Sequence, residues 1–129
     1  MKYMMQMNVK GGSYQMEGWA PKDIKAMVDF MHRFNTELKK NGNWVSGEGL
    51  VAPEFARMVK ADDHGRPVVT DGPFAESKEF IAGFWIVEVK NAEEAYALAA
   101  KVSTCPGPGG KPMNMPLELR QVGDAPKTD

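Results

Sequence analysis

Cysteine and histidine are scarce in this sequence, which has one cysteine and two histidines among 129 residues. A single cysteine, Cys105, cannot form an internal disulfide, so the chain suits a reducing compartment and we expect a cytoplasmic location. His32 and His64 stand in unrelated settings, and the sequence has no Cys-x-x-Cys or His-x-x-x-His spacing. No metal site is therefore predicted.

A charge excess and a long apolar run are also absent. Sixteen basic and 17 acidic residues give a formal net charge of −1 and a pI near 6.1, so no field attracts the chain to nucleic acid. No segment approaches the roughly 18 apolar residues of a membrane span or the layout of a signal peptide. We expect no nucleic-acid partner and no membrane association, whereas a small-molecule ligand is compatible with this composition.

The segment 105–112 has the prolines, glycines and lysine of a phosphate-binding loop without its pattern. Cys105 stands where the motif requires glycine, and Pro112 stands where it requires serine or threonine. Two prolines also remove amide donors from such a cradle. We interpret the segment as a structured connector and expect no cofactor. Phe84 and Trp85 lack the basic entry of an RNA-recognition motif, so we assign them to the core or to a dimer interface.

Apolar periodicity predicts strands and helices in the order β-α-β-β-β-β-α-β. We expect strands over 2–9, 44–50, 55–61, 67–71, 81–89 and 117–122, one helix over about 21–40, and a second that begins at Asn91. The turn 62–65 joins two of the short strands as a hairpin. Without this inserted hairpin, the order is the split βαβ of an α+β, ferredoxin-like fold. Residues 1–122 then form one domain, and 123–129 form a flexible tail.

The first helix carries an apolar stripe at helical spacing, which should face the sheet. Its members are Ile24, Met27, Val28, Met31, Phe34 and Leu38. His32 lies roughly 40° beyond Val28, on the shoulder between core and solvent. Two helices can cover one face of a sheet, yet 81–89 is apolar on both parities, which is typical of a strand covered on both faces. We therefore predict a homodimer with face-to-face sheet packing.

Asp71 stands where a strand meets a forced turn. Val68, Val69 and Thr70 favour a strand, and Gly72 with Pro73 prevents its continuation. A carboxylate held at such a turn can cap the backbone with its side chain. Alternatively, it can orient an imidazole for proton transfer if it meets a histidine. Sequence spacing leaves both interpretations open.

Three segments together resemble the YCII-related family, specifically its DGPF-domain branch, over residues 1–122. They are Gly47-Glu48-Gly49-Leu50, the run 69–79 that contains Asp71-Gly72-Pro73-Phe74, and the run 82–89. The resemblance implies a ferredoxin-like protomer that forms a dimeric α/β barrel. It also implies a cleft with a histidine and an aspartate, which His32 and Asp71 match. Some relatives resemble dehydrochlorinases or are encoded beside sigma factors, and most have no assigned reaction.

Two functions follow as hypotheses. The first is a metal-free acid/base enzyme of lyase or isomerase type, with His32 as general base or acid and Asp71 as its orienting group. The residues expected to contact its small substrate are Glu48, Phe74, Glu76 and Lys78, while Trp19 and Trp85 are candidates to line an apolar pocket. The alternative is a noncatalytic ligand-binding or regulatory partner protein. In a third interpretation, both residues only satisfy the turn and the helix end.

Overall fold

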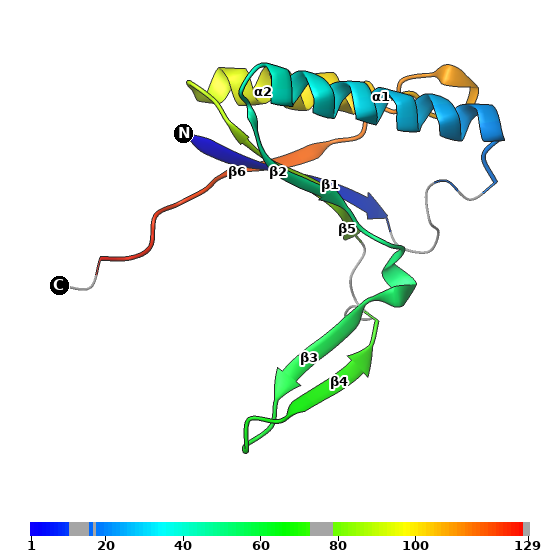
Figure 1. Cartoon of the computed structure of the whole chain (residues 1–129). Helices are drawn as coiled ribbons and strands as arrows, with labels where there is room; N and C mark the ends of the chain where they lie inside the picture. Colours follow the sequence, from blue (N-terminus) through cyan, green and yellow to red (C-terminus); the bar gives the residue numbers. More distant parts are fainter. Residues whose placement is uncertain (11–15, 17, 73–78, 128–129) are drawn as a thin grey trace.

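The computed structural model describes residues 1–10, 16, 18–72 and 79–127, and Figure 1 shows the arrangement of its elements. In chain order these are β1 (Lys2–Lys10), α1 (Pro21–Lys40), β2 (Trp44–Gly49), β3 (Arg57–Ala61), β4 (Pro67–Asp71), β5 (Glu79–Glu88), α2 (Ala92–Ser103) and β6 (Leu117–Gln121), with 3₁₀ helices over Pro53–Phe55 and Pro108–Gly110. The described residues contain no helix that is both long and apolar enough to cross a membrane.

Four strands form one antiparallel sheet in the order β2-β5-β1-β6. Both helices lie on one face of this sheet (Figure 1). This is the strand order and layering of a ferredoxin-like α+β fold, so that prediction is confirmed. The central position of β5, between β2 and β1, agrees with the apolar residues at both its odd and its even positions.

The boundaries of α1 follow from its sequence. Pro21 occupies the first turn, where its missing N–H breaks no helical hydrogen bond, and Asp23 places a negative charge near the positive end of the helix dipole. The helix ends before Asn41, whose N–H donates to the Glu37 carbonyl at 2.9 Å. Gly42 follows with a φ of 77°, a backbone conformation that glycine adopts without steric cost.

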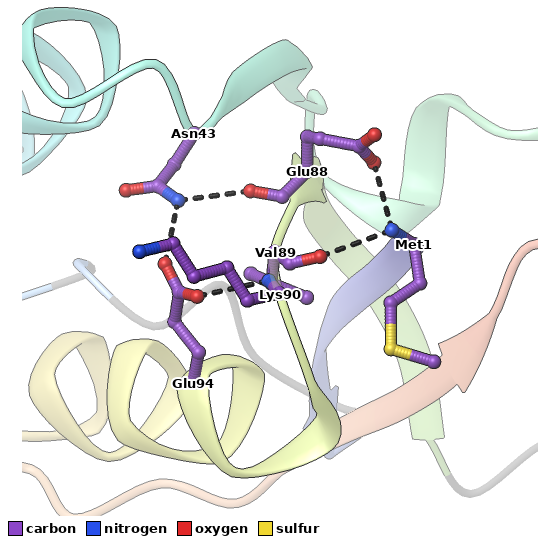
Figure 2. Close-up of polar contacts among 6 residues, drawn as sticks. All are labelled: Met1, Asn43, Glu88, Val89, Lys90 and Glu94. Carbon is purple, nitrogen blue, oxygen red and sulfur yellow. Dashed lines mark hydrogen bonds and ion pairs between the residues drawn. The ribbon is translucent and has the colours of Figure 1, made fainter.

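A polar network joins α2 to the sheet and to the start of the chain (Figure 2). Asn43 is buried, and its Nδ2 donates to the Glu88 carbonyl at 2.8 Å and to Glu94 Oε1 at 3.0 Å. The other carboxylate oxygen of Glu94 accepts from the Lys90 N–H at 2.9 Å. The N-terminal amine of Met1 donates to the Val89 carbonyl at 3.0 Å. These contacts satisfy backbone groups where β5 leaves the sheet.

The first turn of α2 explains why Glu94 is held in this network. The Asn91 side chain caps the helix by accepting from the Glu94 N–H at 2.9 Å, as the sequence predicted. In a complete capping box the Glu94 carboxylate would accept from the Asn91 N–H. Here it accepts from the Lys90 N–H, one residue earlier. The hydrogen bonds from Lys90 and Asn43 hold the pKa of Glu94 below its usual range.

The hydrophobic core lies between the sheet and the two helices. Met5 and Val87 from the sheet, with Leu38 and Val102 from the helices, are fully buried. Phe34 meets Trp85 edge to face, with ring centroids 5.6 Å apart and an interplanar angle of 85°.

Two expectations are corrected by the structure. Val28 was placed on the buried stripe of α1, but it is 38% exposed, and Phe30 packs against the core as a half-buried side chain. The expected strand 55–61 begins only at Arg57, because Pro53–Phe55 forms a 3₁₀ helix. Proline favours the first turn of a helix, and its missing N–H disfavours a sheet ladder.

The sheet face opposite the helices is not covered by either helix (Figure 1). Alternation along β1 and β5 places Met4, Phe84 and Ile86 on this face, and Ile81 follows beyond the irregularity in the β1–β5 register. Ile81 is 37% exposed, and the other three are half-buried. The same alternation places Gln6 and Asn8 of β1 on this face. Within the described residues, one chain therefore leaves a mixed surface of apolar and amide side chains at the centre of its sheet.

Strands β3 and β4 form a separate two-stranded sheet, which extends away from the main sheet on the side opposite the helices (Figure 1). The predicted turn is confirmed, because Asp62 Oδ1 accepts from the N–H groups of His64 and Arg66. Val59 pairs with Val69, and both side chains are exposed.

Candidate functional site

A cavity of about 340 Å³ lies between α1 and the part of the sheet formed by β1, β2 and β5. Most of the side chains around it are apolar or aromatic, which is typical of small-molecule sites. Its described lining comprises Met7, Val9, Met16, Trp19, Met27, Met31, Asn35, Gly47, Glu48, Gly49, Leu50, Ala82, Gly83, Phe84, Trp85 and Met113.

Three glycines in β2 and β5 line the sheet side of the cavity. A Cβ atom at Gly47 would lie 3.0 Å from the side chains of Trp44 and Trp85. A Cβ atom at Gly83 would lie 3.0 Å from the Glu48 carbonyl oxygen. At Gly49, by contrast, an added Cβ would meet no heavy atom within 4 Å. The strand glycines thus serve close packing at two positions and leave space at the third.

Methionine provides much of the remaining wall. Five of the ten methionines in the sequence line the cavity, and they come from β1, α1 and two connecting segments. Thioether side chains are flexible and polarisable, so they adapt to ligands of different shape and make favourable contacts with rings. The cavity is therefore suited to a small apolar molecule.

Asn35 is the one amide side chain in the described lining. The Trp85 indole Nε1 donates a hydrogen bond to Asn35 Oδ1 at 2.8 Å. This bond joins the helical side of the cavity to its sheet side. It also holds Trp85, whose ring forms part of the wall, in one orientation.

Trp19 and Trp85 both line the cavity, so they occupy the positions expected of pocket aromatics. Glu48 contributes to the same lining. Alternation along β2 places the Glu48 side chain on the sheet face opposite that of Gly47 and Gly49, and it is exposed. Phe74, Glu76 and Lys78, the other expected substrate contacts, lie outside the described residues.

His32 and Asp71 occupy different parts of the protomer. His32 is exposed on α1, in a shallow surface depression that it shares with Arg33, Thr36 and Lys40. Neither His32 nor Asp71 belongs to the described lining of the cavity. Asp71 ends β4 on the projecting hairpin, and its side chain is 98% exposed. Within the described chain, no hydrogen bond or ion pair joins His32 to Asp71.

The nearest charge partner of Asp71 is Arg57, which lies opposite it in the hairpin register. The Arg57 Nε and Asp71 Oδ1 atoms are 3.5 Å apart. Arg57 also donates from its guanidinium to the Ala56 carbonyl at 2.7 Å. In the single chain, Asp71 therefore takes part in an exposed cross-strand ion pair.

Two further groups among the described residues bear on chemistry, namely possible metal ligands and the cysteine. Among the described residues, no cluster of three His, Cys, Asp or Glu side chains could hold a metal ion. Cys105 is fully buried, and burial raises the pKa of its thiol to about 11. Its thiolate form is therefore scarce near neutral pH, and the side chain serves packing.

Asn35 and the methionine wall were missed by reasoning from sequence. Met27 and Met31 were identified as members of a buried stripe, and periodicity gives the same pattern for a packed face and for a cavity wall. Among the strand glycines, only Gly49 leaves open space, and the sequence does not distinguish it from Gly47 and Gly83, which serve close packing. Asn35, one turn after Met31, gave no signal of its own in the sequence.

Comparison with known proteins gives a family without an assigned activity. The YCII-related domain family matches residues 1–106, a segment that contains the cavity-lining strands, α1 and Asp71. An uncharacterised protein of Rhizobium meliloti (strain 1021) is 32% identical over 76 residues, which cover 59% of this chain and 61% of the relative. The chain thus aligns with less than two thirds of that relative. Membership of the DGPF branch stays a prediction. The extent of the family match shows that the chain belongs to the YCII-related domain family.

Proposed function

We propose that this protein binds a small, largely apolar molecule in the cavity between α1 and strands β1, β2 and β5. The observation that carries the proposal is a space of about 340 Å³ whose walls are methionine, tryptophan and glycine. A cavity of this size accommodates a compact organic molecule, and apolar walls favour its transfer from water. This is the noncatalytic ligand-binding function that the sequence left as an alternative.

The cavity can be narrowed at a position that tolerates a side chain. Gly49 lines the cavity, and a Cβ atom there meets nothing within 4 Å, so Gly49→Leu should reduce the space without forcing the strands apart. Gly123→Leu is the matched control, because Gly123 is equally open and lies outside the described lining.

The test is a titration of the full chain, with its methionine methyl groups labelled with ¹³C, against a set of small apolar fragments. We expect the resonances of Met27 and Met31 to shift for some fragments in the wild type and in Gly123→Leu. Binding should weaken at least tenfold in Gly49→Leu. Equal binding to Gly49→Leu and the wild type, or no methyl shift with any fragment, would show that the cavity is not a ligand site.

We further propose that two copies pack through the open sheet faces, as in the dimeric barrel that the family resemblance implies. The apolar residues Met4, Phe84 and Ile86 on a face without helices support this arrangement. Sedimentation equilibrium should give a dimer for the wild type and a monomer for Ile86→Lys. A monomeric wild type at micromolar concentration would contradict the proposal.

The acid/base activity needs His32 and Asp71 to meet, and an exposed Asp71 on a projecting hairpin is available to a second copy. On this proposal His32 moves the proton and Asp71 orients its ring, in a lyase or isomerase reaction of a small molecule. The activity is tested by screening candidate substrates with His32→Ala and Asp71→Asn. Turnover that both substitutions leave unchanged would exclude the pair. Loss of turnover with retained fragment binding would separate chemistry from binding.

A further inference from the structure

The hydrogen bond between Trp85 and Asn35 fixes which way the Asn35 amide faces. An indole N–H can only donate, so the atom 2.8 Å from Trp85 Nε1 must be the carbonyl oxygen of the amide. The amide nitrogen is consequently turned away from Trp85. A side chain that could otherwise rotate by half a turn is held in one orientation by its neighbour.

The amide nitrogen of Asn35 is available to a ligand. Among the described residues, no hydrogen-bond acceptor pairs with Nδ2. Asn35 is half-buried, and no buried side-chain nitrogen or oxygen in the described chain lacks a partner. Nδ2 is therefore not fully buried, on a residue that belongs to the cavity lining.

The orientation of Asn35 Nδ2 is fixed by the hydrogen bond that its own side chain accepts from Trp85. The Trp19 indole N–H is the other side-chain donor of the described lining. The Trp85 N–H is already engaged, and Glu48 carries an acceptor on the opposite face of β2. The Phe84 ring likewise lies on the opposite face. The other side chains of the described lining, apart from the Trp19 indole, are aliphatic or thioether groups or glycine. A largely apolar cavity with an oriented amide donor favours molecules that place an acceptor at that point.

We infer that Asn35 determines ligand specificity: its Nδ2 donates a hydrogen bond to an oxygen acceptor, such as a ketone carbonyl, on an otherwise apolar molecule. This inference rests on the proposed ligand-binding function of the cavity and adds the chemical class of the ligand. Trp85 acts as a positioning residue, because it holds the amide with its donor side toward the ligand. A ligand with no acceptor would leave the donor without a partner once water is displaced, which disfavours binding.

The experiment compares two probes of nearly equal shape, cyclohexanone and methylenecyclohexane. Their affinities are measured by ¹³C-methionine methyl shifts on the full chain. The ratio of the two affinities cancels their common apolar contribution. Asn35→Asp keeps an acceptor for Trp85 and removes the donor, and Asn35→Leu removes both groups without introducing a buried charge. Asn41→Asp makes the same chemical change outside the described lining, at the exposed end of α1.

We expect the ratio of ketone to alkene affinity to fall about fivefold or more in both Asn35 variants, as the loss of one hydrogen bond predicts. The ratio should stay at the wild-type value in Asn41→Asp. Circular dichroism confirms folding, and Asn35→Leu carries the test if Asn35→Asp unfolds. If both probes bind and the ratio of ketone to alkene affinity changes by less than twofold in the Asn35 variants, the role of Asn35 is overturned. The ligand site itself would then still stand. No binding of either probe to the wild type overturns the inference together with the ligand site.

Discussion

The two ends of α1 face the same sheet in different ways. Toward its C-terminal end, Phe34 and Leu38 are 3% and 2% exposed and pack on Trp85 and the centre of the core. Nearer its N-terminal end, Met27 and Met31 are half-buried and border a cavity over strand glycines. One end of the helix contributes packing energy and the other leaves space. The comparison separates the part that stabilises the fold from the part that can bind a ligand.

The largest effect on stability should come from the packed, C-terminal end of α1. Leu38→Ala is expected to lower the free energy of unfolding by about 3 kcal/mol, because it opens a void in a fully buried site. Met31→Ala should cost about 1 kcal/mol, because part of that side chain already faces open space. Urea unfolding of both variants measures the difference. Equal losses of unfolding free energy would show that α1 is packed alike at Met31 and at Leu38.

A somewhat smaller loss of stability is expected just after the C-terminal end of α1, where Asn43 contacts the end of β5. Asn43→Ala removes the hydrogen bonds to the Glu88 carbonyl and to Glu94, and should lower the free energy of unfolding by about 2 kcal/mol. Asn41→Ala is the control, since Asn41 is exposed and lies two residues away. Thermal unfolding compares them. A loss in Asn41→Ala as large as that in Asn43→Ala would contradict the role of the network.

The same network should make stability depend on pH in the acid range. The pKa of Glu94 is lowered by the Lys90 N–H and the Asn43 amide, so its contribution is complete above the unfolded-state value, about 4.3, and is lost as the pH falls through the folded-state pKa. Between pH 5 and 3, wild-type protein should therefore lose more stability than Glu94→Gln. Urea midpoints at each pH measure this, and parallel profiles would be inconsistent with the lowered pKa.

The smallest effect is expected on the hairpin. Arg57→Ala removes an ion pair in which the Asp71 side chain is almost fully exposed, so the free energy of unfolding should change by less than about 0.5 kcal/mol. Val59→Thr serves as a control on the same strand. Urea unfolding at low and high salt measures the effect. A loss above 1 kcal/mol that disappears in high salt would show that the pair has a larger structural role.

Much of the fold could be predicted because its signals are local. Alternation identified β1, Pro21 and Gly42 bounded α1, and Asp62 with Gly65 marked the hairpin turn. Such signals depend on backbone preferences of neighbouring residues, which act before any long-range contact forms. The start of β3 was predicted two residues too early, because Pro53 favours a 3₁₀ helix over Pro53–Phe55.

The candidate site was harder to predict, because it is assembled from residues distant in the chain. Met27 and Gly83 line one cavity although they are far apart in sequence. His32 and Asp71 were linked by family resemblance. In one chain, His32 is on α1 and Asp71 is on the β3–β4 hairpin, and these two elements lie on opposite sides of the main sheet (Figure 1). The pairing of these two side chains stays a prediction.

The sequence by itself determined the order of elements, the ferredoxin-like class and the family, because these depend on periodicity, turn residues and short motifs. Only the tertiary structure decided that strand glycines and methionines enclose a cavity, and that Trp85 orients the amide of Asn35. The physical reason is that a cavity is space left between side chains of different elements. Local preference sets where each element begins, and packing between elements sets what remains open.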